Sequence, residues 1–327
     1  MYKNKKVLVA GGAGLIGRQL VDLLLLEGAQ VFVSDIRCPE DEFLKKISFK
    51  QLDLTDYENC VSACEEMDYV FNLLCMKGSP KVMKEKPASH FVPMILFNTN
   101  LMKAAYNCKV KKYLYASSLA VYAPAEIFYE DTVWSTFPSP NDRFAAWAKR
   151  MGELQAEAYQ IQYDWNDISI VRPANTYGPH DDFDSPGAMV VPSLIKKVLS
   201  GDDEIIAWGD GLNVRDFIHS KDVARGMLIV MNEAPGPYRP VNLGSGTGYS
   251  IKELIEAILE NVEMKPKIIW DTNRITGDNI RVLDIRRAES MGFKPEISLK
   301  EGIKDTMMWY INNVDRTLGH NREEIKK

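Results

Sequence analysis

The stretch Gly11-Gly-Ala-Gly-Leu-Ile-Gly17 decides the fold of this chain. An apolar run, Lys6–Ala10, precedes it, and apolar residues at helical spacing follow it from Leu15 to Leu26. This order predicts a strand, a tight glycine turn and a helix. Glycines at such a turn let the backbone approach a pyrophosphate, whose charge is stabilised by the unpaired amides at the start of the helix. The stretch therefore predicts a dinucleotide-binding site.

An acidic residue follows the glycine turn at the spacing typical of a ribose contact. Asp35 ends the next apolar strand, Gln30–Ser34, where a carboxylate accepts hydrogen bonds from the adenosine ribose. The same carboxylate repels a 2′-phosphate, which favours NAD, and Arg37 is close enough to keep NADP as the less favoured alternative. The cofactor-binding residues that we expect in this region are Gly11, Gly14, Leu15, Ile16, Gly17, Asp35, Asp53, Leu54 and Leu74.

The composition limits the classes of protein to consider. The 327 residues are 46% apolar and 26% charged, which suits two domains with a substantial core. Because the net charge of −5 comes with interspersed signs, neither a nucleic acid nor a membrane surface is an expected partner. No apolar run is long enough to span a bilayer. The five cysteines lack metal-like spacing, which predicts reduced thiols, a cytoplasmic location and no metal site.

Strand and helix patterns alternate through the first half of the chain, which predicts a parallel sheet wrapped by helices. Asp53 follows a strand over residues 47–52, and it either reaches the adenine or caps the helix that begins near Asp56. We expect a doubly wound Rossmann-type α/β domain, a smaller mixed α/β substrate domain and a solvated tail. Their residues are 1–175 with about 214–245 for the first, 176–213 and 246–314 for the second, and 315–327 for the tail.

Two long helical patterns, over residues 94–107 and 144–163, predict how the chain assembles. The first of them has two apolar faces, so we expect one face to pack on the sheet and the other on a partner subunit. A homodimer formed through the two long helices is the expected assembly.

Further stretches carry a resemblance to a known family. They include Ala116-Ser-Ser118, Trp147–Glu153 and Arg172–Phe183. With the glycine turn, they resemble the extended short-chain dehydrogenases/reductases of the NAD-dependent epimerase/dehydratase type, and among these the GDP-fucose synthases and GDP-sugar epimerases. The resemblance implies epimerisation or reduction of a GDP-linked hexose or deoxyhexose. It implies that Ser117 or Ser118 donates to a sugar oxygen and that Lys149 holds the nicotinamide ribose.

The family's catalytic tyrosine stands four positions before the lysine, and here that position is Ala145. A general acid–base group of this kind commonly contributes about 10² to 10⁴ in rate. Three explanations stay open. The alanine is a substitution introduced to trap a complex, or a natural variant in which Tyr122, Tyr177 or His180 acts instead, or the mark of a protein that binds nucleotide sugar and NAD without turnover.

The resemblance also implies a Cys and a His that exchange protons at C3 and C5 of the sugar. His180 matches the His, whereas Leu119 or Ala120 occupies the place of the Cys. Without the Cys, a single proton exchange, a C4 oxidation and reduction, or a simple keto reduction remain. Sugar 4,6-dehydratases carry an Asp-Glu pair at these two places, so dehydration is disfavoured and stays as an alternative.

The resemblance assigns the nucleotide to the second half of the chain. Arg215 is expected on the diphosphate, because a guanidinium fork matches phosphate oxygens. Asn175 and Arg281 are expected to face the same diphosphate, and Trp208 and Val190 are expected near the base.

Overall fold

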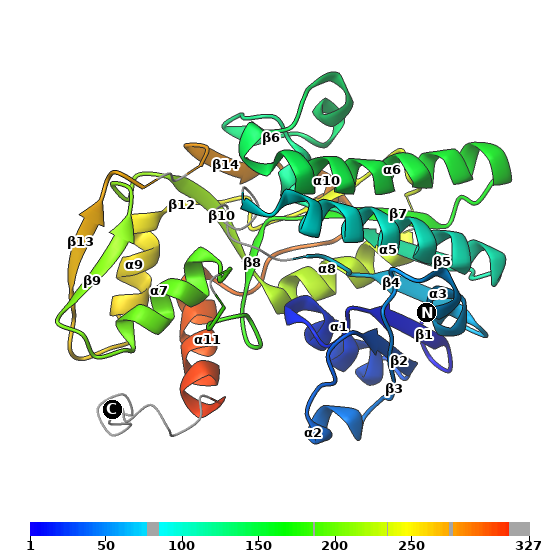
Figure 1. Ribbon diagram of the computed structural model, residues 1–327, viewed down its shortest axis with the longest axis horizontal. Helices are drawn as coiled ribbons and strands as arrows, with labels where there is room; N and C mark the ends of the chain where they lie inside the picture. The colour runs from blue at the N-terminus through cyan, green and yellow to red at the C-terminus, as the bar shows by residue number, and fades with distance from the viewer. Residues whose placement is uncertain (77–84, 186, 234, 275–276, 314–327) are drawn as a thin grey trace.

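A parallel β-sheet of seven strands organises the larger part of the described chain (Figure 1). The computed structural model describes residues 1–76, 85–185, 187–233, 235–274 and 277–313. In their order across the sheet, the strands are β11 (Val241–Leu243), β7 (Ile168–Pro173), β5 (Lys112–Ala116), β4 (Tyr69–Asn72), β1 (Lys6–Ala10), β2 (Gln30–Asp35) and β3 (Ser48–Gln51). All neighbours run in parallel and the order changes direction between β1 and β4, so the predicted Rossmann-type α/β fold is confirmed.

Helices cover both faces of this sheet and bury two apolar cores. Alternate residues of β1 point to opposite faces, so Val7 and Val9 join one core while Leu8 and Ala10 join the other. A run that is buried on both faces explains why β1 is apolar throughout. The first core is covered by α1 (Leu15–Leu26) and α8 (Ser220–Glu233), and the second by α3 (Tyr57–Cys64), α5 (Pro87–Asn107) and α6 (Arg143–Tyr163).

The helix α5 is longer than the apolar pattern over 94–107 predicts. It begins at Pro87, about two turns earlier. Proline is tolerated in the first helical turn because its missing N–H has no partner there in any case. Across the described ranges, no helix has both the length and the apolar composition that a membrane crossing requires.

A second lobe follows in the chain and packs beside the carboxyl ends of the main strands (Figure 1). Its larger sheet has β8 (Asn175–Tyr177), β10 (Val214–His219), β12 (Gly248–Ser250), β14 (Ile280–Leu283) and β6 (Ile127–Phe128), and its smaller sheet pairs β9 (Glu204–Trp208) with β13 (Lys267–Asp271). Its apolar core lies among α7 (Val190–Val198), α9 (Ile251–Leu259) and α11 (Leu299–Asn313). Shorter helices are α2 (Asp41–Leu44), α10 (Arg286–Ser290), η1 (Leu119–Val121), η2 (Glu130–Ser135) and η3 (Pro140–Asp142).

The boundary between the two domains stays a prediction. Residues 214–219 form β10 and pair with the second lobe, whereas the α8 and β11 segments that follow them join the main sheet. The expected tail over 315–327 lies outside the described residues.

Candidate active site

The glycine turn joins β1 to α1 at the carboxyl edge of the main sheet. Gly11 has a φ of +80°, a conformation that side chains rarely adopt. A Cβ added to Gly17 would lie 2.5 Å from the carbonyl oxygen of Gly11 and 2.6 Å from the Cα of Gly12. Gly14 is the N-cap of α1 and makes no side-chain capping bond, so the first amides of the helix can meet a phosphate. The turn thus fits the pyrophosphate of a dinucleotide.

Asp35 lies directly beside this turn. Its carboxylate accepts hydrogen bonds from the backbone amides of Ala13, at 3.3 Å, and Arg37, at 3.1 Å. The nearby Arg18 donates to both oxygens of Glu40, at 2.5 and 2.6 Å, and this pairing lowers the pKa of Glu40 to about 2. The positive charge closest to the turn is therefore already matched by a carboxylate.

The other predicted cofactor residues lie along the same edge. Leu54 is buried after β3, and Leu15 is buried while Ile16 is half-buried at the start of α1. The exposed Asp53 accepts from the backbone and hydroxyl of Thr55, at 2.9 and 2.7 Å. The cap of α3 is instead Asp56, whose carboxylate accepts from the amide of Glu58 at 2.8 Å.

Lys149 reaches this edge from α6. Its ammonium donates to the carbonyl oxygen of Leu74, two residues beyond β4, at 3.0 Å, and to that of Ala116, the last residue of β5, at 2.7 Å. The side chain is 2% exposed, and burial lowers the pKa of the ammonium. Since an ammonium has three protons, these two bonds within the described chain leave one for a ligand.

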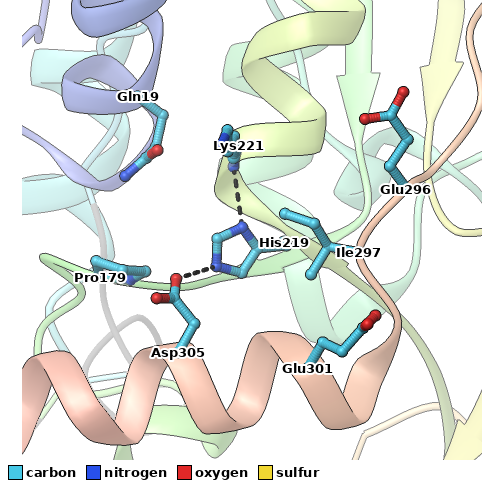
Figure 2. Close-up of a pocket in the computed structure, with 8 residues that line it drawn as sticks. All are labelled: Gln19, Pro179, His219, Lys221, Glu296, Ile297, Glu301 and Asp305. Atoms are coloured by element: carbon cyan, nitrogen blue, oxygen red, sulfur yellow. Dashed lines mark hydrogen bonds and ion pairs between the residues drawn. The ribbon is translucent and has the colours of Figure 1, made fainter.

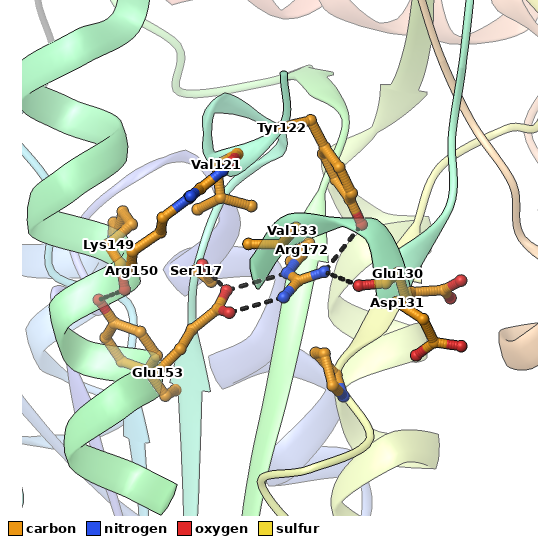
Figure 3. A network of polar contacts seen from close by, with 12 residues as sticks. Ser117, Val121, Tyr122, Glu130, Asp131, Val133, Lys149, Arg150, Glu153 and Arg172 are labelled. Carbon is orange, nitrogen blue, oxygen red and sulfur yellow. Dashed lines mark hydrogen bonds and ion pairs between the residues drawn. The ribbon is translucent and has the colours of Figure 1, made fainter. Parts of the chain in front are cut away.

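The two candidate serines have different surroundings. Figure 3 shows that Ser117 belongs to a buried network, in which its hydroxyl donates to Glu153 at 2.5 Å. Glu153 also accepts two bonds from Arg172, at 2.9 and 2.6 Å. Ser118 is half-buried, and its oxygen accepts from the amide of Ala120 at 3.1 Å as the cap of η1. The Ser118 hydroxyl proton is thus the one suited to a sugar oxygen.

Ala145 lies half-buried on α6, one helical turn before Lys149. The two tyrosines considered as replacements both have hydrogen-bond partners inside the protein. Tyr122 donates to Asn242 at 2.6 Å and accepts from Arg172, and burial raises its pKa to about 12. Tyr177 is 1% exposed and donates to the carbonyl of Leu299 at 3.4 Å. Both hydroxyls are engaged inside the protein.

His180 adopts a positive φ of +68° in the loop after β8. Its ring lies 4.6 Å from the ring of Trp309 on α11, centroid to centroid. Burial, together with the charge of Arg18, lowers the pKa of His180 to about 4, so the ring is neutral at pH 7. No recorded contact within the described chain joins His180 to Ser118 or Lys149.

A pocket of about 530 Å³ lies beside the His180 loop (Figure 2). Its buried His219 lies 3.2 Å from Asp305 through Nε2 and accepts the amide of Lys221 through Nδ1 at 3.3 Å. None of the predicted site residues lines this pocket, although Pro179, the neighbour of His180 in sequence, does. The lining residues are Gln19, Pro179, His219, Lys221, Glu296, Ile297, Glu301 and Asp305.

Strand register brings together the residues predicted for the diphosphate. Arg215 on β10 stands directly opposite Arg281 on the parallel β14, and Asn175 on β8 pairs with Phe217, two residues farther along β10. Burial and the neighbouring Arg281 lower the pKa of Arg215 to about 10. The carboxylates of Asp142 and Asp278, which the sequence did not single out, lie against these arginines.

The residues predicted for the base lie elsewhere in the second lobe. Trp208 ends β9 with 44% of its surface exposed, and the guanidinium of Arg274 lies 5.4 Å from its ring centroid. Val190 begins α7 and packs against the core of this lobe. Among the described residues, no group of three or more His, Cys, Asp or Glu side chains is arranged to hold a metal ion.

Comparison with known proteins gives relatives over nearly the whole chain. GDP-L-fucose synthase 1 of Arabidopsis thaliana is 31% identical over 322 residues, covering 95% of each chain. GDP-L-fucose synthase of Escherichia coli is 27% identical over 340 residues, covering 97% of this chain and 99% of its own.

Solved structures share the fold. UDP-glucose 4-epimerase of Thermus thermophilus in complex with NAD is 28% identical with a TM-score of 0.82, covering 94% of this chain and 100% of its own. The Thermotoga maritima UDP-glucose 4-epimerase with UDP-glucose is 26% identical, also with a TM-score of 0.82. The match covers 95% of this chain and 100% of that chain. A family model matches residues 7–244, and the chain belongs to the NAD dependent epimerase/dehydratase family.

Proposed function

We propose that this protein is an NAD-dependent epimerase or reductase of a GDP-linked hexose or deoxyhexose. The observation that carries the proposal is the pairing of Arg215 with Arg281 on neighbouring strands, in a chain whose glycine turn fits a dinucleotide. Two adjacent guanidinium groups suit the paired phosphates of a nucleotide sugar. The GDP-L-fucose synthases among the relatives favour guanine as the base.

We assign each side chain of the proposed site a role in binding or in the transfer of hydride and protons. Bound NAD would accept or return a hydride at the sugar carbon. Lys149 would hold the nicotinamide ribose with its remaining proton, and Ser118 would donate to the sugar oxygen. Ser117 would have a positioning role, because its hydrogen bond to Glu153 on α6 would hold the end of β5 in place. Trp208 and Val190 remain the proposed contacts of the base, and Asn175 that of the diphosphate.

We infer that NAD is preferred to NADP. A 2′-phosphate would meet the carboxylate of Asp35, and the cation beside the turn, Arg18, is already paired with Glu40. Both features favour a free ribose hydroxyl at this place. Asp53, at the same edge, is the proposed contact of the adenine.

The role of His180 as a proton exchanger at C3 or C5 is part of the proposal, and deuterium exchange tests it. In heavy water, the enzyme should incorporate deuterium beside the keto group of a GDP-4-keto-hexose. The substitution His180→Asn should abolish this exchange and leave GDP binding unchanged. Exchange that persists in the variant would exclude His180 from the role.

The substrate itself can be tested with the purified protein. Mass spectrometry of bound ligands should detect NAD and a guanine nucleotide, and calorimetric titration should give binding of GDP in preference to UDP. Binding of GDP and NAD without turnover of any GDP-linked keto sugar would favour the alternative of an impaired binding protein. Formation of a 4-keto product from a GDP-hexose would favour the 4,6-dehydratase alternative.

The outer faces of α5 and α6 support a homodimer. They expose Val92, Leu96, Met151, Leu154 and Ile161, which recur at helical spacing along two helices that pack side by side. We expect Leu154→Glu to turn a dimer into a monomer in size-exclusion chromatography with light scattering. A cytoplasmic location agrees with the five free cysteines.

A further inference from the structure

Four charged side chains meet where β10 and β14 approach the start of α6. Arg281 contacts the carboxylate of Asp142 through Nη2, and its Nε lies 3.5 Å from Asp278. Arg215 is close enough to all three for each to influence its pKa. The side chains of Arg281, Asp142 and Asp278 are only 13%, 21% and 11% exposed. The cluster therefore holds its charges largely away from solvent.

The two carboxylates are held in different ways. Asp278 accepts from the hydroxyl of Ser139, at 3.0 Å, and from the side-chain amide of Asn141, at 2.9 Å. Asp142 precedes the first residue of α6 without making a side-chain capping bond, and its recorded partner in the described chain is Arg281. Asp278 therefore has neutral donors as well as its ion pair with the Nε of Arg281, whereas the contact that holds the carboxylate of Asp142 is the one with Arg281.

The guanidinium of Arg281 also has an unsatisfied group. Its Nε is buried and makes no hydrogen bond within the described chain, and the Oδ2 of Asp278, which lies 3.5 Å away, is likewise buried without one. A buried donor and a buried acceptor that face each other without a hydrogen bond cost free energy, so a ligand oxygen that reaches the Nε would lower that cost. The proposed diphosphate would supply oxygens to this side chain.

Carboxylate and phosphate oxygens compete for the same guanidinium protons, because both accept charge-assisted hydrogen bonds. We propose that Asp142 occupies the place of the substrate diphosphate on Arg281 and gives it up when nucleotide binds. The proposal rests on the proposed role of Arg281 in binding the diphosphate. A ligand has to carry enough charge to displace the carboxylate, so Asp142 selects nucleoside diphosphates against nucleoside monophosphates and neutral nucleosides.

The position of Asp142 links this exchange to the rest of the site. Residues 142, 145 and 149 stand at intervals of three and four at the start of α6, and such residues share one face of a helix. The carboxylate would therefore be released beside the helix face that carries Ala145 and Lys149. The exchange would take place within the site in which the sugar is expected.

Calorimetric titration of the full chain tests the proposal. Asp142→Asn removes the competing charge with little change of shape, so it should bind GDP about three- to tenfold more tightly than the unsubstituted chain does. Its affinity for guanosine should change less than twofold, because guanosine has no phosphate. Asp142→Ala should tighten GDP binding by a similar factor. Asp142→Glu keeps the carboxylate, so its affinity for GDP should equal that of the unsubstituted chain.

Asp278→Asn is the matched control, since it removes one negative charge from the same cluster and keeps the Asp142 contact. It should not tighten GDP binding. Equal tightening in both variants would mean a general charge effect and would overturn the proposal, as would unchanged or weaker binding of GDP by Asp142→Asn. Thermal unfolding would verify that each variant is folded.

The identity of the nucleotide base and the role of Asp142 can be tested separately. If the unsubstituted chain binds UDP but not GDP, the assignment of guanine as the base fails. The affinities of the Asp142 and Asp278 variants for UDP would then decide the role of Asp142 in the same way. If no variant binds either nucleoside diphosphate, both the proposed function and the proposed role of Asp142 are overturned.

Discussion

Replacing Ala145 with Tyr should raise the rate of hydride transfer by about 10² to 10⁴, the range that a positioned general acid–base group contributes. This range corresponds to about 3 to 5 kcal/mol of activation free energy. The two positions suit the pairing, because Ala145 and Lys149 stand one turn apart on the same face of α6. A phenol at position 145 would therefore lie near the ammonium of Lys149.

The charge of Lys149 sets the expected size of the effect. Its hydrogen-bond acceptors, Leu74 and Ala116, are carbonyl groups and leave the positive charge unneutralised. At about 6 Å, the spacing of neighbours on a helix, and an effective dielectric constant of about 20, a phenolate would gain about 3 kcal/mol. That gain lowers the phenol pKa by about two units from about 10. The phenol donates its proton during reduction, so the rate of Ala145→Tyr should then fall as the pH rises through about 8.

The assay is the absorbance of the reduced cofactor during reduction of a GDP-4-keto-hexose. Ala145→Phe is the matched control, because it adds the same ring without the hydroxyl. The double variant Ala145→Tyr with Lys149→Met should lose the gain. Equal activity of the Tyr and Phe variants, or no gain in the Tyr variant, would refute the reasoning and point to another group as the proton donor.

Three further perturbations have outcomes that follow from the contacts. Glu153→Leu should lower the free energy of unfolding by about 3 to 5 kcal/mol in urea titrations, because Arg172 is left buried and unpaired, whereas Ser117→Ala should cost about 1 kcal/mol. Asp35→Ser should weaken NAD binding about tenfold and strengthen NADP binding in calorimetric titrations. The folded-state pKa of His180 lies near 4, below the ordinary 6.5, so the unfolded chain binds more protons between these values and stability falls as the pH drops through this window. His180→Gln should remove that part of the fall between pH 7 and pH 4, as measured by the urea midpoint.

The main sheet was predictable because its signals are local. The glycine turn, the apolar strands and the helical spacing of α1 each lie within a few residues, and the fold that they predict is the one observed. The beginning of α5 at Pro87 was missed, since Pro93 lies inside this helix and a proline at such a place normally indicates a helix boundary. Polar residues in a first helical turn carry little hydrophobic signal.

The candidate site was predictable only in part, because its contacts join distant segments. Arg281 and Asp142 are 139 positions apart, and the sequence has no pattern that pairs them. The difference between Ser117 and Ser118 depends on which of them faces Glu153, which the sequence of β5 does not specify. The neighbours of His180 come from α1 and α11, near opposite ends of the described chain.

The cations Arg18, Arg281 and Lys149 of the proposed site share one property, which is that each has a partner within the protein. Arg18 is paired with Glu40, Arg281 with Asp142, and Lys149 with two carbonyl groups. These partners offset the cost of burying charge before any ligand arrives. Ligand affinity then reflects the difference between the contacts that these cations make with the ligand and those that they make within the protein. It therefore depends on the charge of the ligand. A site built in this way would discriminate by ligand charge, as the proposed preferences for nucleotide sugars over neutral sugars and for NAD over NADP require.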